Sequence, residues 1–423
     1  MRRLYTVLLY LFSPLLVARL LWKSIWLTSY RHRMGERFYW GKQLKTPVDI
    51  WLHGVSLGEV VAATPLVEAL LGESYRILIT CMTPTGSDYI RSRFGERVAH
   101  HYVPYDLPWC VRRFYKIYTP RLGLIMETEL WPNLIYEAAR FEVPLLLLNA
   151  RLSDGAFKQY RYVDFMFKPI LNQLMVILAQ SKNDAERFRM LGAMRVEVLG
   201  NMKFDVSVPS LGDKAACFHW KEAWGVSRPV LMLASTHENE EQQILSCLDQ
   251  LKVTIPDLLV LIAPRHPERF QTVLQLSERL GFKTGRRSQP STIEETMEVM
   301  IIDTLGELLD FYQVSDYAFV GGSLVPIGGH NVLEPIAVQV PVLCGPYMQN
   351  SKSICEALCE QGALQKVETA DELMRALSVM HQEVTVRIKQ IAAASAVLQA
   401  NRGTIAKYLI YINKVLGSRS LWA

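Results

Sequence analysis

The hydrophobic positions of the chain form two series of short apolar runs, separated by amphipathic stretches of helix length. The first series, from residue 48 to about 200, contains VDIWLHG, YRILITC, RLGLIME, VPLLLLN and LMVILAQ. The second begins near residue 229 and contains PVLMLAST, LLVLIAP, VMIID, YAFVGG and VPVLCG. Strands of a parallel sheet are buried on both faces and are therefore continuously apolar, and helices cover such a sheet. The pattern predicts two doubly wound α/β domains.

One further apolar run, residues 4–22 (LYTVLLYLFSPLLVARLLW), is just long enough to cross the hydrocarbon core of a membrane. Pro14 and Arg19 interrupt it, although an arginine near a helix end can extend to the headgroups. Basic residues are more frequent after the run than before it, which places the rest of the chain in the cytoplasm. They are Lys23, Arg31, Arg33, Arg37, Lys42 and Lys45, against Arg2 and Arg3. We predict an N-terminal membrane anchor, with a helix lying in the membrane interface as the alternative.

A segment rich in Gly, Pro, Ser and Asp, residues 200–216, separates the two series and is predicted to be an interdomain linker. The chain is accordingly divided into an anchor (1–25), a first domain (26–205) and a second domain with the C-terminal helices (206–423). In open α/β sheets ligands bind at the carboxyl ends of the strands. Two such domains that face each other indicate a cleft lined by the residues that follow the strands.

The net charge limits the kinds of partner that the protein can bind, and the cysteine content indicates its compartment. The chain has 423 residues, with 46 Lys and Arg against 41 Asp and Glu, a formal net charge of +5. This mild excess gives no nucleic-acid signature but suits an anionic membrane or a phosphorylated substrate. The seven cysteines show no paired spacing, which favours buried thiols in a reducing compartment over a disulfide framework or a metal site.

Acidic residues follow two strands of the first domain. HGVSLGE (53–59) ends in Glu59 between a strand and a helix, and ETELWPN (127–133) places Glu127 and Glu129 before a helix that Pro132 can start. An acid at a helix start interacts favourably with the helix dipole, by about half a kcal/mol. That role explains one acid more readily than two. Short polar segments follow neighbouring strands, at residues 83–86, 104–106 and 149–153. Together they predict a polar cleft wall.

The second domain carries candidate phosphate-binding features at its strand ends. Arg265 and His266 in PRHPER (264–269) are either phosphate contacts or residues of a solvated basic turn. The glycine-rich stretch FVGGSLVPIGGHNVLEPIA (319–337) lies before a helix expected to start near Asn331, where backbone amides can approach an anion. Glu334 can accept hydrogen bonds from ribose hydroxyls. Gly306 and Glu307 are expected in the first turn of another helix. These features predict a nucleotide-binding domain.

Seven motifs in one order carry a family resemblance. HGVSLGE, ETELWPN, NARLS, GNMKFD, APRHPER, DTLGEL and GGSLVPIGGHNVLEP resemble the 3-deoxy-D-manno-oct-2-ulosonic acid (Kdo) transferases of Gram-negative bacteria, over almost the whole chain. One departure is His53-Gly54, where an Ala-Ser-like pair is more usual. The resemblance implies a GT-B glycosyltransferase fold, in which two Rossmann-like domains face each other across a cleft. The first would bind the acceptor and the second the CMP-sugar donor.

The resemblance also implies the reaction and the residues that perform it. The donor would be CMP-Kdo and the acceptor the tetraacyldisaccharide-1,4'-bisphosphate precursor of lipid A, with inversion at the anomeric carbon and no metal or other cofactor. The enzyme would lie at the cytoplasmic side of the bacterial inner membrane, without a nucleic-acid partner. Glu59 would be the general base, and Glu129 and Lys203 would stabilise charge. The implied CMP contacts are Pro264, Arg265, Gly306, Glu307, Asn331, Val332, Leu333 and Glu334.

Two other classes of protein share part of this pattern. Another membrane-associated GT-B enzyme, such as a nucleotide-sugar epimerase or a different glycosyltransferase, would have the glycine-rich loop but should lack the ETELWPN and SLGE pair. A non-catalytic, membrane-tethered nucleotide-binding module would have no need of Glu59 in a cleft. Protection against heat by CMP, rather than by uridine diphosphate, distinguishes the Kdo transferase from the first class.

Overall fold

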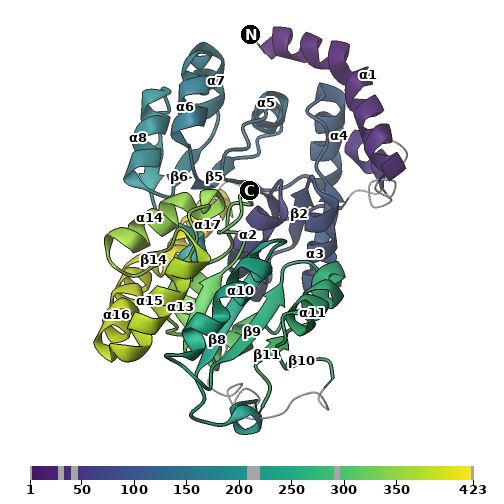
Figure 1. Ribbon diagram of the computed structural model, residues 1–423. Coiled ribbons are helices and arrows are strands. Elements are labelled where there is room, and N and C mark those ends of the chain that lie inside the picture. The colour runs from purple at the N-terminus through teal and green to yellow at the C-terminus, as the bar shows by residue number, and fades with distance from the viewer. Residues whose placement is uncertain (1, 27–32, 40–45, 207–219, 290–295, 421–423) are drawn as a thin grey trace. The chain divides into compact units, whose positions relative to one another are not determined.

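The computed structural model describes residues 2–26, 33–39, 46–206, 220–289 and 296–420 (Figure 1). The chain forms two compact units, residues 1–205 with 403–423, and residues 206–402. In the described part of the chain, each unit contains one parallel sheet of seven strands covered by helices. The prediction of two doubly wound α/β units is confirmed.

The sheet of the first unit has the strand order β3-β2-β1-β4-β5-β6-β7 among the described residues. Its strands are β1 (Ile50–His53), β2 (Ile77–Cys81), β3 (Ala99–Tyr102), β4 (Leu122–Met126), β5 (Leu145–Ala150), β6 (Val176–Ala179) and β7 (Val196–Val198). Strands β1 and β4 are neighbours near the middle of the sheet, with His53 paired to Ile125. Because they run parallel, the segments that follow them, with Glu59 and Glu129, leave the sheet at the same edge.

The helices of the first unit begin at residues suited to a helix start. They are α1 (Arg2–Trp26), α2 (Leu57–Gly72), α3 (Pro84–Phe94), α4 (Pro108–Tyr118), α5 (Pro132–Arg140), α6 (Asp154–Arg161), α7 (Asp164–Leu171), α8 (Lys182–Met190) and α17 (Thr404–Ser420), with short 3-10 turns η2 (Met34–Phe38), η3 (Gly95–Arg97) and η4 (Met202–Phe204). Ser56, Thr83 and Ser153 cap α2, α3 and α6 through their hydroxyl oxygens. Pro132 is the first residue of α5, as the sequence predicts.

The sheet of the second unit has the order β10-β11-β9-β8-β12-β13-β14 among the described residues. Its strands are β8 (Val230–Thr236), β9 (Leu259–Pro264), β10 (Thr284–Arg286), β11 (Val299–Ile301), β12 (Tyr317–Val320), β13 (Val342–Cys344) and β14 (Gln365–Lys366). Its helices are α10 (Glu240–Lys252), α11 (Phe270–Arg279), α12 (Leu308–Gln313), α13 (Leu333–Ala337), α14 (Lys352–Glu360), α15 (Ala370–Gln382) and α16 (Val384–Asn401), with 3-10 turns η6 (Pro267–Arg269) and η8 (Gln349–Ser351).

Two helix starts in the second unit differ from the prediction. Glu307 precedes α12, whereas the sequence analysis placed Gly306 and Glu307 inside the first turn. The helix expected near Asn331 begins at Leu333, because the Asn331 side chain accepts a hydrogen bond from the Leu333 amide and remains outside the helix. Both segments are therefore loops at the point where the sequence predicts helix.

The C-terminal helix also departs from the prediction, because α17 belongs to the first unit. Its Tyr408, Ile412 and Leu416 are buried in the core that contains strands β1, β2, β4 and β5. The Asp205 carboxylate accepts hydrogen bonds from the amides of Gly403 (2.7 Å) and Ile405 (2.5 Å) at the helix start. The assignment of residues 403–423 to the second domain is thus corrected, since order along the chain does not show that the helix returns.

Other predictions fall partly outside the described residues. The expected linker, residues 200–216, is described only as far as Val206. Of the basic residues after the apolar run, Arg31, Lys42 and Lys45 lie outside the described part of the chain, as does the side chain of Lys23. The apolar run itself forms the helix α1, which is long and apolar enough to cross a membrane on length and composition alone.

A buried carboxylate fastens the glycine-rich loop of the second unit. Glu240, the first residue of α10, is 0% exposed. Its two oxygens accept hydrogen bonds from the backbone amides of Gly322 (2.6 Å), Ser323 (2.9 Å) and Leu324 (2.8 Å), and from that of His237 (3.0 Å). A carboxylate without a cation is stable in such a place only because backbone N–H groups surround it. Glu240 therefore fixes the start of the loop that follows β12.

We expect Tyr408→Phe to destabilise the first unit by about 1–3 kcal/mol, because the buried Asn149 amide would lose its acceptor. The Tyr408 hydroxyl accepts that hydrogen bond at 2.9 Å and donates to the Leu178 carbonyl at 3.3 Å. Equilibrium unfolding in urea measures the change. Tyr162→Phe is the matched control, since Tyr162 is 87% exposed in the same unit. Equal midpoints for the two variants would contradict the role of Tyr408 in attaching α17.

We expect Glu240→Gln to lower the unfolding free energy of the second unit by at least about 2 kcal/mol. The amide nitrogen of Gln would face backbone N–H donors, and the charge that strengthens the remaining bonds would be lost. Glu238→Gln changes an exposed carboxylate in the same turn and serves as the control. Hydrogen exchange at residues 321–324 should accelerate only in the Glu240 variant; protected amides in that variant would show that the loop is held by other contacts.

Candidate active site

Glu59 lies at the carboxyl edge of the first sheet and belongs to the start of α2. Its carboxylate accepts hydrogen bonds from the Val55 amide and the Ser56 hydroxyl, both at 2.9 Å, while its own amide donates to the Ser56 hydroxyl oxygen at 3.4 Å. This arrangement resembles a capping box, except that the Glu59 carboxylate accepts from the amide of Val55, one residue before the N-cap Ser56, and from the Ser56 hydroxyl rather than from the Ser56 amide. The helix-start role considered from the sequence is therefore real. Each carboxylate oxygen keeps a second lone pair for another donor.

Glu59 is more deeply buried, and closer to other carboxylates, than a helix start requires. The residue is only 9% exposed. Burial raises the pKa of Glu59 to about 7, and the negative charges of Glu127 and Glu129 add to the rise, against the opposing hydrogen bonds from Val55 and Ser56. The structure thus brings Glu59 and Glu129, both predicted site residues, into electrostatic contact. A carboxyl group with a pKa near neutrality exchanges protons readily at physiological pH.

The loop between β4 and α5 holds the second acid. Glu127 has a left-handed backbone (φ 53°), which is unusual for a residue with a side chain and turns the chain sharply at the end of β4. The Glu129 carboxylate accepts a hydrogen bond from the Trp131 indole N–H at 2.8 Å. Burial raises the pKa of Glu129, and the charge of Glu127 raises it further. The loop thus adds two carboxylates to the edge occupied by Glu59.

His53, at the end of β1, is a site residue that the sequence analysis did not propose. Its Nδ1 lies 3.0 Å from the Thr80 hydroxyl, and its Nε2 is buried without a hydrogen-bond partner. Burial lowers the pKa of His53 to about 4, so the ring is neutral. It packs edge-on against Trp131, with 5.6 Å between ring centroids. In the sequence, only the departure of His53-Gly54 from the family pattern drew attention to this histidine.

Lys203 lies in η4, directly after β7. The Asn201 side chain accepts a hydrogen bond from the Lys203 amide at 3.0 Å, and the Asn149 side chain accepts one from the Met202 amide at 3.0 Å. The turn η4 packs against α2, the helix that carries Glu59. Within the described residues, the half-buried Lys203 forms no ion pair with Glu59 or Glu129. The structure therefore places Lys203 on the same side of the sheet without joining it to the acids.

In the second unit, Arg265 connects two strand ends. It follows the buried Pro264, the last residue of β9, and its amide donates to the Thr236 carbonyl at the end of β8 (3.0 Å). Burial lowers the pKa of His330 and the positive charge of Arg265 lowers it further, whereas at Glu334 the charge of Arg265 opposes a rise in pKa that burial causes. The residues predicted from two separate motifs, APRHPER and the glycine-rich loop, therefore meet at one edge.

The segment from Asn331 to Glu334 presents polar groups at that edge. Burial raises the pKa of Glu334, and the Asn331 amide side chain donates to the Glu334 carboxylate at 3.0 Å. Val332 and Leu333 are buried, so their contribution to a ligand is limited to the backbone. Asn331 is exposed and Glu334 half-buried. This segment keeps hydrogen-bonding groups available next to Arg265.

Gly306 and Glu307 are held by a different set of contacts. The Glu307 carboxylate forms an ion pair with Arg287 (2.7 Å) and accepts a hydrogen bond from the Thr304 hydroxyl. The Arg287 guanidinium lies over the Trp220 ring, 4.4 Å from its centroid. Gly306 is exposed and has a left-handed backbone (φ 88°) that favours glycine. These contacts fix the loop after β11 but do not join it to Arg265.

Two histidines that the sequence analysis left out of the site, His237 and His330, meet at the glycine-rich loop. The Nε2 atoms of His237 and His330 are 2.8 Å apart, and their rings are stacked in parallel planes. One of the two nitrogens must carry the proton and the other accept it. Burial lowers the pKa of His330 to about 4, and Arg265, His237 and His266 add to the effect. The signals were the histidines in STHE and GGHN, the first directly after a strand and the second directly after a glycine pair.

A resident metal ion was not predicted, and no candidate site is found in the described part of the chain. There, no group of three or more His, Cys, Asp or Glu side chains has the arrangement needed to hold a metal ion.

Comparison with known proteins identifies the family. Residues 32–206 match the model of the 3-deoxy-D-manno-octulosonic-acid transferase (kdotransferase) family. The chain is 38% identical to the 3-deoxy-D-manno-octulosonic acid transferase of Haemophilus influenzae, over 96% of this chain and 97% of the relative. It is 33% identical to the transferase of the same name from Bordetella pertussis, over 98% of this chain and 100% of the relative.

Solved structures agree in fold. The crystal structure of a glycosyltransferase from Rickettsia africae matches with a TM-score of 0.56 at 15% identity, covering 88% of this chain and 99% of that chain. At this identity the likeness concerns the fold alone, and it agrees with the two parallel sheets described above. The fold is of the GT-B class, and the chain belongs to the 3-deoxy-D-manno-octulosonic acid (Kdo) transferase family of glycosyltransferases.

Proposed function

We propose that the protein transfers Kdo from CMP-Kdo to the tetraacyldisaccharide-1,4'-bisphosphate precursor of lipid A, with inversion at the anomeric carbon and with Glu59 as the general base. The observation that carries the proposal is the position of Glu59. It is a buried carboxyl group at the carboxyl edge of the sheet, and burial together with the charges of Glu127 and Glu129 raises its pKa to about 7. Family membership supports the transfer of Kdo.

In the proposed step, Glu59 takes the proton from an acceptor hydroxyl while that oxygen attacks the anomeric carbon of Kdo. The bond from this carbon to the CMP phosphate oxygen breaks, and CMP leaves with the bonding electron pair. A single displacement inverts the configuration. A base with a pKa near the working pH is both ionised in a useful fraction and strong enough to accept the proton in the transition state. The raised pKa of Glu59 meets this requirement.

Glu129 and Lys203 have supporting roles in the proposal. The Trp131 indole orients the Glu129 carboxylate, and the negative charge of Glu129 helps keep the pKa of Glu59 high. A second acid at the edge can also accept a hydroxyl of the acceptor sugar and so position it. Lys203 supplies a positive charge on the side of α2, where it can offset the charge that develops on the leaving phosphate.

The donor side of the proposal rests on the second unit. Arg265 gives a fixed positive charge for the CMP phosphate. The amides of Gly322, Ser323 and Leu324 already donate to Glu240, so they would hold the glycine-rich loop in place rather than bind the phosphate. Glu334 and Asn331 offer an acceptor and a donor for ribose hydroxyls or the base. Gly306, Glu307 and Pro264 would contribute through the backbone and through shape. CMP carries one phosphate, whose charge a guanidinium and backbone amides can balance.

The acceptor is an anionic lipid, which agrees with a site near a membrane. We propose that the protein acts at the cytoplasmic side of the bacterial inner membrane and that α1 attaches it there. The apolar length of α1 and the basic residues that follow it support this location.

We expect Glu59→Gln to lower the turnover number by about 10²–10⁴-fold, because general-base catalysis is lost. CMP affinity should stay unchanged, because the candidate donor contacts lie in the other unit. Product formation from CMP-Kdo and the lipid precursor, followed by mass spectrometry, measures the change. Retention of more than about a tenth of the activity would place the base elsewhere.

The pH dependence of turnover tests the electrostatic environment of Glu59. Turnover should rise with pH through a midpoint near 7, where the Glu59 carboxyl ionises. Glu127→Gln removes a negative neighbour, so the midpoint should move to lower pH, whereas Glu96→Gln, an exposed acid in the same unit, should leave it in place. Because the pKa of Glu59 is raised in the folded protein, ionisation of its carboxyl group opposes folding. The free energy of unfolding that the protonated carboxyl contributes is therefore lost as the pH rises through about 7. An unshifted midpoint in Glu127→Gln would refute the coupling.

We expect Arg265→Ala to weaken CMP binding by about 1.5–3 kcal/mol, the usual value for a lost hydrogen bond to a charged group. Arg279→Ala is the control, because Arg279 is exposed at the end of α11 in the same unit. Calorimetric titration measures the affinities, and thermal unfolding should show stabilisation of the wild type by CMP rather than by uridine diphosphate. Preferential protection by uridine diphosphate would favour a different GT-B enzyme.

A further inference from the structure

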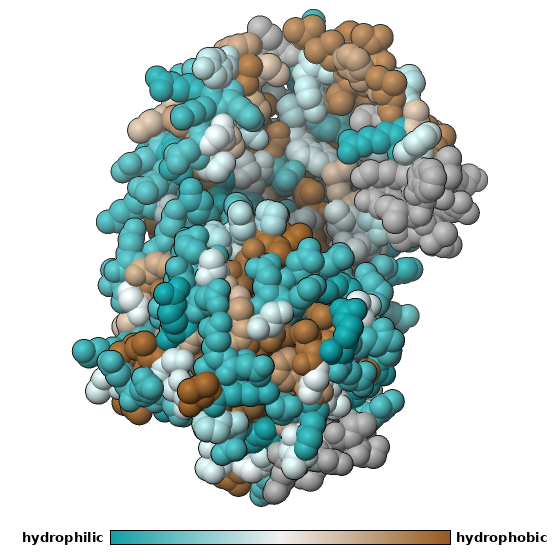
Figure 2. All heavy atoms as spheres, in the orientation of Figure 1, coloured by the Kyte–Doolittle hydropathy of each residue, from teal (hydrophilic) through white to brown (hydrophobic). Residues whose placement is uncertain are grey.

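The helix α1 has two faces that differ in chemistry. Among its described side chains, the partly or fully buried ones recur at helical spacing and face the first unit: Arg2, Tyr5, Thr6, Leu9, Ser13, Val17 and Leu20. The residues on the other side are exposed and almost all apolar: Leu4, Val7, Leu8, Tyr10, Leu11, Phe12, Leu15, Leu21 and Trp22. Figure 2 shows the resulting hydrophobic surface along α1, which is absent from the neighbouring hydrophilic helices in that view. A contiguous apolar patch of this kind marks an interaction surface.

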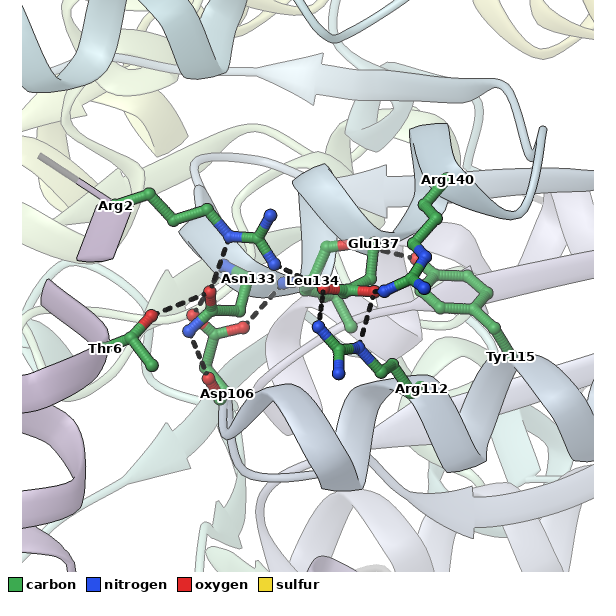
Figure 3. Close-up of polar contacts among 9 residues, drawn as sticks. All are labelled: Arg2, Thr6, Asp106, Arg112, Tyr115, Asn133, Leu134, Glu137 and Arg140. Carbon is green, nitrogen blue, oxygen red and sulfur yellow. Dashed lines mark hydrogen bonds and ion pairs between the residues drawn. The ribbon is translucent and has the colours of Figure 1, made fainter.

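The N-terminal half of α1 is fastened by buried polar groups (Figure 3). Arg2 donates to the Asn133 side chain at 3.0 Å and forms an ion pair with Glu137. Thr6 donates to the same Asn133 oxygen at 3.1 Å, and the Tyr5 hydroxyl donates to Asp106 at 2.9 Å. These bonds join α1 to α5 and to the start of α4, all within one unit.

Glu137 makes separation of α1 from the first unit energetically unfavourable. Its side chain is 1% exposed, and its carboxylate meets the guanidinium groups of Arg2, Arg112 (3.0 Å) and Arg140 (3.8 Å). A buried carboxylate that loses a partner is strongly unfavourable. The tip of α1 is therefore part of the hydrogen-bonded structure of the first unit.

The other end of the described apolar run is held by hydrophobic packing. Leu20 is 6% exposed and lies in a cluster with Phe38, Leu107 and Cys110, against which Val17 and Leu9 also pack. From Arg2 to Leu20 a helix advances about 27 Å, close to the roughly 30 Å thickness of the hydrocarbon core. A spanning helix would thus have to draw α4 and α5 into the hydrocarbon with it, including the charged groups of Arg112, Glu137 and Arg140.

We propose that α1 does not cross the membrane but lies in the plane of an anionic lipid leaflet, docked on α4 and α5, with its outer apolar face among the acyl chains. Exposed Arg3 and Arg19 lie near the two ends of that face, and Arg112 of α4 interacts electrostatically with Tyr10 on it, so that positive charge borders the apolar surface. This pattern matches a helix at the interface of an anionic leaflet. This proposal rests on the proposed function for one point only, the identity of the membrane as the bacterial inner membrane.

The docking also reaches the candidate active site. Asp106, which accepts from Tyr5, accepts hydrogen bonds from the amides of Asn133 (3.0 Å) and Leu134 (2.7 Å) and so fixes the first turn of α5. Trp131, which orients Glu129, lies directly before that turn. A helix held in the leaflet in this way sets the depth of the Glu129 loop relative to the lipid.

Cysteine accessibility distinguishes the two placements in the full chain. Arg3→Cys is combined with Val253→Cys, a reporter that is 85% exposed in the second unit. Inverted inner-membrane vesicles and intact spheroplasts are treated with a membrane-impermeant maleimide, and labelling is read by peptide mass. We expect both introduced cysteines to be labelled in inverted vesicles and neither in spheroplasts. Labelling at position 3 only in spheroplasts, or only after detergent is added, overturns the proposal.

Vesicle binding tests the outer face independently. Full-length protein is floated with vesicles of phosphatidylcholine, alone or mixed three to one with phosphatidylglycerol. We expect Leu11→Glu and Leu15→Glu to lower binding to the anionic vesicles at least about tenfold with an unchanged melting temperature, because both residues are exposed, and Val253→Glu to have no effect. Unaltered binding of both α1 variants overturns the proposal. Neither measurement requires Kdo transfer, so its failure is separable from failure of the proposed function.

Discussion

Every strand in the described part of each sheet runs in the same direction, and the rest of the structure depends on this. Parallel strands bring the segments that follow them to one edge, whatever their distance along the sequence. In the first unit β1 and β4 are neighbours, so Glu59 and the Glu127–Glu129 loop meet although about seventy residues separate them. In the second unit β8, β9 and β12 are central neighbours, so His237, Arg265 and His330 meet in the same way.

The buried acids of the molecule fall into two kinds. Glu240, Asp106 and Glu137 are each matched by donors: four backbone amides around Glu240, two amides and a tyrosine hydroxyl around Asp106, and three arginines around Glu137. They hold loops and helices in place. Glu59 receives one amide and one hydroxyl, and its other charged neighbours are negative. Burial raises the pKa of Asp106 to about 7 as well, so the raised pKa of Glu59 does not by itself distinguish the two kinds. Glu59 differs because it has fewer donors and stands beside two further carboxylates at the carboxyl edge of the sheet, which suits chemistry better than structure.

The attachment of α1, the proposed membrane-binding helix, extends to the acidic edge through a short series of contacts. Tyr5 binds Asp106, Asp106 caps α5, and α5 begins one residue after Trp131. The C-terminal helix has a similar effect on another part of the first unit, because Asp205 caps α17 immediately after the η4 turn that carries Lys203. The two terminal helices thus stabilise the segments on which the proposed catalytic residues lie.

The sequence by itself determined the fold class and indicated the candidate site segments. Continuous apolar runs predicted the strands, because a parallel sheet excludes water from both faces, and Ser56 and Pro132 marked helix starts because their local chemistry suits few other positions. Motif order identified the family. Only the tertiary structure decided that α17 returns to the first unit, that Glu307 is paired with Arg287, and that His53, His237 and His330 belong to the site edges. It also raised the pKa of Glu59, since burial and the approach of two distant carboxylates are properties of packing, which no local pattern of residues contains.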